Sequence, residues 1–256
     1  MASSVAVGAI LIALVLMPGI ASAESKTESL DRLVRAYPDA LTGHDEKNIF
    51  WRDGTVMPAD DGADQKSFDD LLRNASIMDQ LRLSYPRSNG NLPAINDDPG
   101  RFRNEAFFKK MYGDCNAGEV KRNLVTITWL PRSWGKIVQV TRVNGIADRL
   151  KQVSAEIDDL KPEIRAAAYP IAGVLSCRAV ADTGRMSMHG YVAAMDLNLK
   201  YSDYWLWAGK AKTIPYRNRM PREIVDIFER HGFIWGGRWY HYDTMHFEYR
   251  PELLIE

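Results

Sequence analysis

Two short segments near the end of the chain carry residues that suit a metal site. The first, residues 187–196, holds His189 and Asp196, and the second, residues 242–248, holds His246. Two imidazoles and one carboxylate fit a catalytic zinc ion, which takes three protein ligands and leaves a fourth position for water. A fold that uses these residues together must bring two widely separated segments to one point.

The spacing of the first pair indicates how the backbone would do this. His189 and Asp196 are too far apart for one helical turn, so we expect a turn followed by an edge strand to bring both side chains together. A histidine near an aspartate is by itself more often a hydrogen-bonded structural pair. The third residue, His246, lies in an alternating run with apolar neighbours and favours the metal site.

Three further charged residues are candidates for roles beside the metal. Asp243 stands three residues before His246, where a carboxylate can act as a base without binding the ion, although turn residues are also common before strands. Glu248 lies two residues after His246, on the same strand face, where it can orient a ligand or merely line the face. Arg178 is a candidate for stabilising an oxyanion, and its alternative is a surface arginine.

The composition bounds the class of protein. The chain has 256 residues, of which 46% are hydrophobic and 26% charged, enough for one sizeable core. Lys plus Arg and Asp plus Glu both number 33, so the formal net charge is zero. Because no bulk positive field is present, nucleic acid is not an expected partner.

The first residues read as a secretory signal peptide. A short apolar run over residues 5–17 is followed by small residues, and cleavage is expected after Ala23. The alternative is an uncleaved anchor, but the run is short for a hydrocarbon core of about 30 Å. No later stretch is long and apolar enough to span a membrane. We therefore expect residues 1–23 to be removed and the mature protein to be exported without stable membrane insertion.

Cys115 and Cys177 are the two cysteines of the chain. In an exported protein an even count favours a disulfide, and this one would contribute about 4 kcal/mol by chain entropy. The alternative is two separate buried thiols.

The pattern of helices and strands predicts an α+β fold, with one compact domain in which helices flank a small antiparallel sheet. Residues 24–100 contain many turn signals and are expected to form a largely irregular N-terminal region of unknown role, with helices over residues 29–37 and 67–83. Residues 101–256 are expected to form the domain that holds the site. Its expected helices span 103–112, 144–159 and 221–230, and its expected strands lie near 125–130, 137–141, 192–197 and 245–249.

The motifs resemble those of a known family. Residues 187–196 are similar to the Ser-x-His-x-x-Gly-x-Ala-x-Asp motif of the M15 zinc peptidases, the VanY or D-alanyl-D-alanine carboxypeptidase family. Residues 231–248 resemble the branch that contains L-alanyl-D-glutamate endopeptidases. The resemblance covers residues 101–256 and does not extend to residues 24–100.

The resemblance implies roles for individual residues. It implies that one zinc ion is bound by His189, Asp196 and His246. It also implies that Asp243 is the general base, that Arg178 contacts the substrate and that Ser187 supports the site. The chain departs from the motif at Val192, where the family has glycine. Because glycine often marks unusual backbone angles, valine there bears on the geometry between His189 and Asp196.

These observations predict an exported zinc metallopeptidase, periplasmic or associated with the cell wall. Peptidoglycan stem peptides with D-residues are the substrates that the resemblance implies, and either carboxypeptidase or endopeptidase activity fits. Two other classes remain open: a zinc-bearing module that binds wall peptides without cutting them, and a structural wall protein whose histidines only pack.

Overall fold

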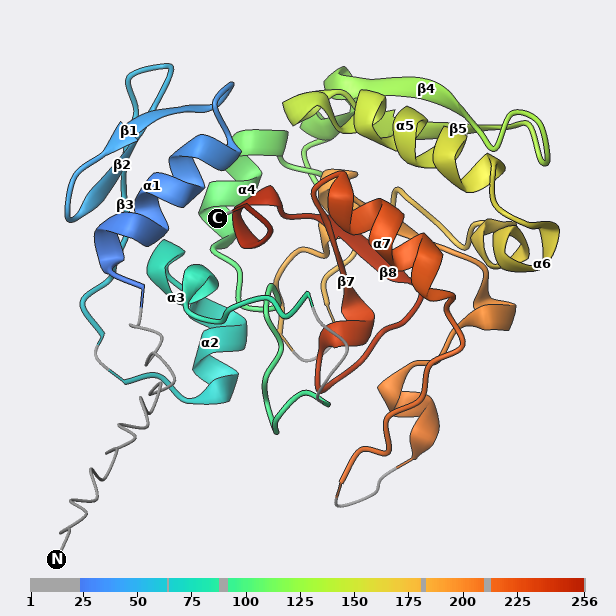
Figure 1. Ribbon diagram of the computed structural model, residues 1–256. Helices are drawn as coiled ribbons and strands as arrows, with labels where there is room; N and C mark the ends of the chain where they lie inside the picture. The colour runs from blue at the N-terminus through green and yellow to red at the C-terminus, as the bar shows by residue number, and fades with distance from the viewer. Residues whose placement is uncertain (1–23, 64, 88–91, 181–182, 210–212, 256) are drawn as a thin grey trace, which may run out of the picture.

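The structure is a computed structural model that describes residues 24–255 except 64, 88–91, 181–182 and 210–212. The expected signal peptide therefore lies outside the described residues. Within the described part, α-helices pack against three small antiparallel sheets, which confirms the α+β class (Figure 1). None of the helices in that part is long and apolar enough to cross a membrane.

The N-terminal region is more regular than expected. Its described residues form three α-helices and one three-stranded sheet: α1 (Lys26–Ala36), β1 (Leu41–His44), β2 (Asn48–Trp51), β3 (Val56–Pro58), α2 (Phe68–Asn74) and α3 (Ile77–Leu81). The expectation of a largely irregular segment was wrong in this respect. Its strands have only three or four residues, too few for a clear alternating pattern among the turn signals.

Serine caps define the helices of this region. Ser25, Ser67 and Ser76 each precede a helix, and each accepts a hydrogen bond from the backbone of the third helical residue, whose acidic side chain bonds back. These reciprocal bonds satisfy backbone N–H groups that have no partner within the helix. The second cap at Ser76 divides what reads as one helix over residues 67–83 into α2 and α3.

The middle of the chain follows the expected pattern. Helix α4 (Glu105–Tyr112) precedes the antiparallel pair β4 (Leu124–Trp129) and β5 (Lys136–Thr141), and helices α5 (Ile146–Asp158) and α6 (Pro162–Arg165) follow. The stripe of Ile146, Leu150 and Val153 is buried on α5. Figure 1 shows α5 lying between the β4–β5 pair and α7 (Arg222–Arg230).

A second three-stranded sheet lies at the centre of the C-terminal half. Its order is β6 (Ala194–Asp196), β8 (His246–Tyr249) and β7 (Phe233–Trp235), all antiparallel. Helix α7 covers the sheet, and Phe228 of that helix stacks on Phe247 of β8 with ring centroids 4.1 Å apart. The expected strands near 192–197 and 245–249 are thus present, and they pair with each other.

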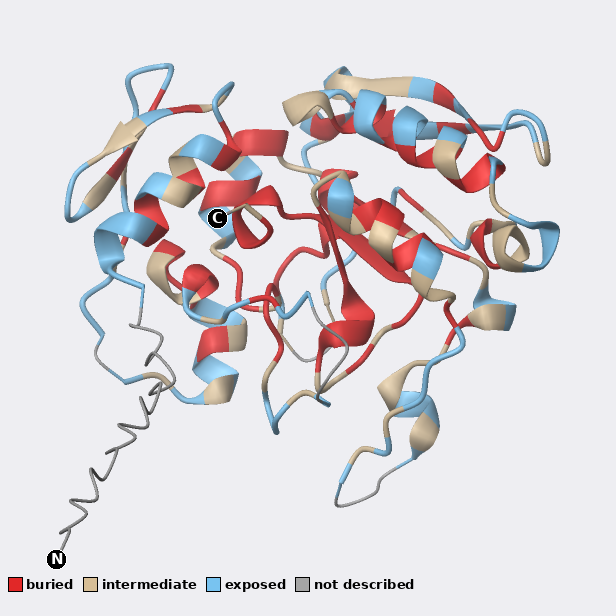
Figure 2. Ribbon diagram, in the orientation of Figure 1, coloured by how far each residue is buried: buried red, intermediate tan, exposed pale blue. Residues whose placement is uncertain are grey.

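One hydrophobic core joins the N-terminal region to the rest (Figure 2). Tyr37, at the end of α1, packs edge-on against Phe107 of α4, and Trp51 of β2 contacts the same ring. Burying these aromatic rings together stabilises the association of residues 24–100 with the sheet-bearing half.

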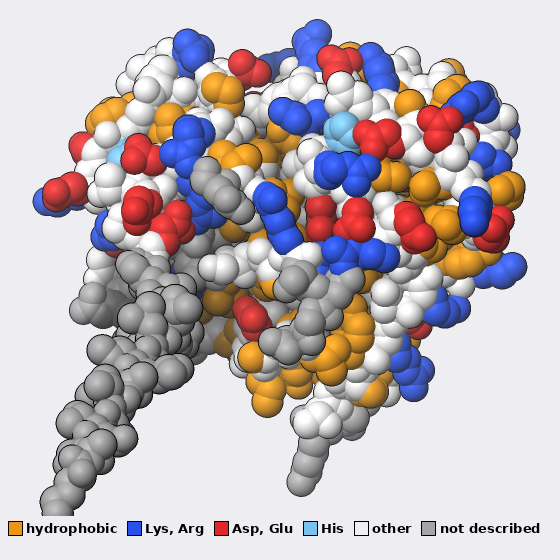
Figure 3. All heavy atoms as spheres, viewed as in Figure 1, with side chains coloured by type: hydrophobic (Ala, Val, Ile, Leu, Met, Phe, Trp, Pro, Cys, Tyr) orange, Lys and Arg blue, Asp and Glu red, His pale blue; other side chains and the backbone are white. Residues whose placement is uncertain are grey.

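Lys and Arg alternate with Asp and Glu over the face in Figure 3, in keeping with the zero net charge.

Candidate metal centre

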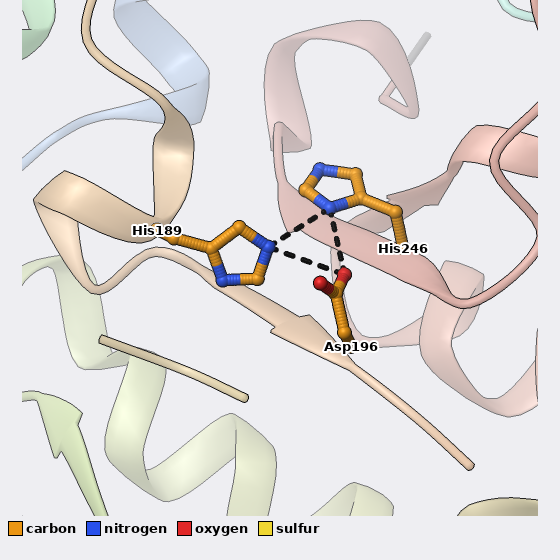
Figure 4. Close-up of side chains that lie close together, drawn as sticks. All are labelled: His189, Asp196 and His246. Carbon is orange, nitrogen blue, oxygen red and sulfur yellow. Dashed lines mark hydrogen bonds and ion pairs between the residues drawn. The ribbon is translucent and has the colours of Figure 1, made fainter. Parts of the chain in front are cut away.

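Three side chains converge at the edge of the central sheet (Figure 4). His189 Nε2 lies 3.1 Å from Asp196 Oδ1 and 3.2 Å from His246 Nδ1. Asp196 Oδ1 and His246 Nδ1 lie 3.0 Å from each other. They are a group of His, Cys, Asp or Glu side chains in the described part of the chain that could hold a metal ion. The structure therefore gathers all three residues that the sequence indicated as ligands.

Sheet register explains the convergence of two of them. Asp196 on β6 is the direct antiparallel partner of His246 on β8, so the two side chains stand on the same face. His189 comes from the short 3₁₀ helix η4 (Met188–Tyr191), which Ser187 caps by accepting a hydrogen bond from the His189 backbone. The expected turn followed by an edge strand is thus observed.

Val192 ends this turn in a left-handed backbone conformation, with φ of 58° and ψ of 25°. Its side chain is buried. For a β-branched residue this conformation costs about 1–2 kcal/mol, whereas glycine adopts it freely. The glycine of the motif is therefore explained by the backbone, and valine occupies the same conformation with strain.

Hydrogen bonds at the far side of each ring fix which nitrogen faces the cluster. His189 Nδ1 lies 2.9 Å from the carbonyl oxygen of Val174, and His246 Nε2 lies 3.0 Å from Glu248 Oε2. With an N–H donating to each of these oxygens, the other ring nitrogens, His189 Nε2 and His246 Nδ1, face Asp196, and each can bind a metal ion when it carries no proton. Such outer hydrogen bonds are typical of histidines that bind metals.

The three donor atoms fit a zinc ion in both chemistry and spacing. Two imidazole nitrogens and a carboxylate oxygen are common zinc ligands, and ligands about 2.0–2.1 Å from a tetrahedral ion lie about 3.3 Å from one another. The observed separations of 3.0 to 3.2 Å are close to that value. A cation at this point would accept all three lone pairs at once.

The charge on each member of the cluster depends on the charges of its neighbours. Burial disfavours the charged forms, but hydrogen bonds with His189 and His246 hold the pKa of Asp196 far below its usual range. Burial also opposes protonation of His246, yet its bonds with Asp196 and Glu248 raise its pKa to about 10. Two carboxylates therefore favour positive charge at this position, whether a proton or a metal ion supplies it.

Glu248 is itself fully buried and held by two arginines. Its carboxylate lies 3.2 Å from Arg103 and 3.0 Å from Arg250. Although burial opposes ionisation, Arg103 and His246 lower the pKa of Glu248 to about 2. Glu248 therefore lies on the same strand face as His246, as expected, and the structure adds a contact between its carboxylate and the His246 ring.

Asp243 lines the same cavity as the three converging residues. Its Oδ1 atom is enclosed and has no hydrogen-bond partner, and burial raises the pKa of its carboxyl to about 6. The backbone N–H of Asp243 donates to the carbonyl of Gly236, where a Cβ atom would lie 2.5 Å from the Asp243 carbonyl oxygen. Only glycine permits this close approach, which fixes the loop before β8.

Arg178 and Ser187 also line the cavity, and Arg178 is exposed. The adjoining Cys177 forms a disulfide with Cys115, which lies between α4 and β4. The expected pairing is therefore present, and it ties the segment that carries Arg178 to the middle of the chain.

Several cavity residues were not found from the sequence. Arg101, Arg103 and Tyr204 line the cavity, and their spacing from the two motifs gives no sign of this. Arg103 reaches the site only through Glu248. His241 lies on the cavity wall as well.

Comparison with known proteins gives one match. Residues 181–249, about a quarter of the chain, match a family model described as D-alanyl-D-alanine carboxypeptidase. The match supports a peptidase. It includes His189, Asp196, Asp243 and His246, and it supports the M15 peptidase family that the motifs indicate. No curated protein and no solved structure matches the chain.

Proposed function

We propose that this protein is an exported zinc peptidase that hydrolyses peptidoglycan stem peptides containing D-alanine. The observation that carries the proposal is the cluster of His189 Nε2, Asp196 Oδ1 and His246 Nδ1, with all separations between 3.0 and 3.2 Å and Asp243 on the wall of the same cavity. The family match, to peptidases that are generally zinc-dependent, supports both the metal and the substrate class.

Zinc held by these three side chains would polarise the scissile carbonyl and bring the pKa of a water molecule toward neutrality. As the water oxygen attacks the carbonyl carbon, Asp243 accepts the proton that the water loses. The same carboxyl then delivers the proton to the amine as the C–N bond breaks. Its enclosed, unpartnered Oδ1 and its raised pKa of about 6 suit both transfers.

Arg178 is placed to stabilise the negative charge that develops on the substrate carbonyl oxygen. Its exposed position on the cavity wall leaves the guanidinium able to reach a substrate oxygen, and charge-assisted hydrogen bonds are about twice as strong as neutral ones. The disulfide at Cys177 limits the movement of this segment. We assign to Arg178 the stabilisation of the oxyanion.

The test separates metal binding from chemistry. Asp243→Ala should keep one zinc per chain while cleavage of purified muropeptides falls by about 10²–10⁴-fold. Asp226→Ala, which removes a carboxylate on α7 that bonds Arg222, is the matched control and should cleave at the wild-type rate. Cleavage by Asp243→Ala at the wild-type rate would remove Asp243 from the mechanism. Zinc and peptide binding by a wild-type protein that cuts nothing would favour the binding module.

Mass spectrometry of the digest identifies the bond. Loss of one terminal alanine means carboxypeptidase activity, and release of larger stem fragments means endopeptidase activity. Export is proposed from the apolar run before Ala23, and the disulfide supports it because such bonds persist in oxidising compartments. A mature N-terminus at residue 24 in the periplasmic or wall fraction is the expected result.

A further inference from the structure

His241 lies on the wall of the metal-site cavity with one ring nitrogen unused, and we infer that this nitrogen, Nε2, accepts a hydrogen bond from a backbone N–H of the substrate peptide outside the scissile bond. The inference rests on the proposed peptidase function and deepens it, because it assigns a further substrate-binding residue. The cavity also holds the three converging residues and has a volume of about 180 Å³. Since ligand pockets usually measure about 300–1,000 Å³, a peptide bound at the three converging residues passes close to every wall.

A buried carboxylate fixes the His241 ring and its proton. Asp98, whose side chain is 0% exposed, accepts a hydrogen bond from the backbone N–H of His241 at 2.9 Å. The other carboxylate oxygen of Asp98 lies 2.6 Å from His241 Nδ1. Because an ionised carboxylate only accepts hydrogen bonds, Nδ1 carries the ring proton. In the neutral ring Nε2 is therefore an acceptor with a free lone pair.

Aromatic contacts hold the same ring in place. Trp205 and Tyr240 meet it edge-on, with ring centroids 4.8 Å and 4.9 Å away, and Phe68 of α2 packs against it at 5.5 Å. Nε2 has no hydrogen-bond partner among the residues that the structure describes. This atom is therefore the polar group that a fixed ring offers to a ligand, and such preorganisation lowers the cost of binding.

The backbone around His241 is fixed as well. The carbonyl oxygens on either side of Asp98 accept hydrogen bonds from the segment before His241, one from the Tyr240 N–H at 3.0 Å and the other from Trp239 Nε1 at 2.7 Å. Asp98 lies outside the family match at residues 181–249. The part of the chain before the matched residues thus positions a side chain of the cavity.

The other polar groups of the cavity leave few acceptors for a substrate N–H. The arginines on the wall only donate hydrogen bonds, so they suit the carbonyl oxygens of a peptide. Asp196 and Asp243 belong to the metal site and to proton transfer in the proposed mechanism. Glu248 already bonds His246 and two arginines. His241 Nε2 supplies an acceptor at this wall, and a peptide N–H buried there without one would lose its hydrogen bond to water.

The experiment measures the binding of D-alanine-containing stem peptides in which one amide N–H outside the scissile bond is replaced by an ester oxygen. Calorimetry uses the zinc-loaded Asp243→Ala protein, so that no peptide is cut. At one position the ester should raise Kd by about tenfold, the scale of one hydrogen bond.

Two further changes at position 241 identify the acceptor. His241→Asn, whose amide can still donate to Asp98 but has no atom in the place of Nε2, should raise Kd about tenfold for the all-amide peptide. The ester that weakens binding to the parent protein should cause no further loss in this variant. His241→Gln, whose amide oxygen can reach the place of Nε2, should retain part of the difference between amide and ester.

Asp98→Asn tests the positioning role of the carboxylate. An asparagine amide that faces Nδ1 donates to it, so the ring proton moves to Nε2, which can then no longer accept. The variant should show the same tenfold loss, and nitrogen NMR should find the proton on Nε2 in place of Nδ1. His44→Asn, which changes a histidine paired with Asp31 away from the cavity, is the matched control and should bind every peptide as its parent does.

Cleavage by the wild type keeps this inference separate from the proposed function. If the wild type cuts no peptide but the binding difference exists and disappears in His241→Asn, the proposed function fails and the role of His241 stands. Three results overturn the inference even if the wild type cuts the peptides. These are no binding of the all-amide peptide, equal binding of every ester, and an ester effect that His241→Asn retains in full.

Discussion

Asp196 and His246 are direct partners across the antiparallel strands β6 and β8, with Asp196 Oδ1 3.0 Å from His246 Nδ1. This one register places a carboxylate and an imidazole side by side, and the cap at Ser187 presents His189 to both. Because a shift of one residue would turn one of the pair to the other face of the sheet, the site depends on the pairing of these two strands.

Glu248 contacts the His246 ring, so under the proposed function its loss should weaken zinc binding. Glu248→Gln should raise the zinc Kd by about 10–100-fold in a chelator competition assay, the range for outer-shell changes. Glu252→Gln is the matched control, because the Glu252 carboxylate also pairs with Arg250 but bonds Tyr37 in place of His246. Equal losses of affinity in the two variants would show that the contact with His246 is unimportant.

Zinc binding should release a proton. The raised pKa of His246, about 10 in the metal-free protein, means that its ring is protonated at neutral pH and must lose that proton to bind a cation. The apparent affinity should therefore rise about tenfold per pH unit through neutrality and level off as pH passes the folded-state pKa. Calorimetry in buffers of different ionisation heat measures the proton count, and a pH-independent affinity would contradict the charge state given for His246.

At position 192 we expect glycine to give a more stable protein than alanine, the reverse of the usual order in stability. Because its backbone is left-handed, Val192→Gly should be about 1 kcal/mol more stable than Val192→Ala in urea unfolding. The control pair is Val153→Gly and Val153→Ala in helix α5, where glycine should be about 1 kcal/mol less stable. The same order at both positions would argue against strain at Val192.

The disulfide should stabilise the fold and the segment of Arg178. Replacing both Cys115 and Cys177 with serine should lower the unfolding free energy by about 4 kcal/mol, the value for a loop of this length. Reductant should destabilise the wild type to a similar extent and leave the double variant unchanged. A wild type whose unfolding midpoint does not respond to reductant would show that the bond contributes little.

The three converging residues His189, Asp196 and His246 were predictable because each lies in a motif whose residue types have a definite chemistry. Their convergence also followed from local patterns, a turn before one strand and an alternating run in the other. The pairing of the two strands, which places Asp196 opposite His246, could not be predicted from the sequence and is seen only in the folded sheet.

The remainder depends on contacts between distant parts of the chain. Arg103 reaches the site through Glu248, and Phe68 of α2 reaches it through His241, and neither contact leaves a periodic signal. The N-terminal sheet was missed because its strands are short. The boundary between α2 and α3 was readable in principle, since Ser76 and Asp79 form a capping box.

The most direct test of the metal centre is anomalous diffraction at the zinc edge from crystals of the zinc-loaded protein. We predict one peak about 2.0–2.2 Å from each of His189 Nε2, Asp196 Oδ1 and His246 Nδ1. Zinc-loaded crystals with no anomalous peak among these three atoms would contradict the account.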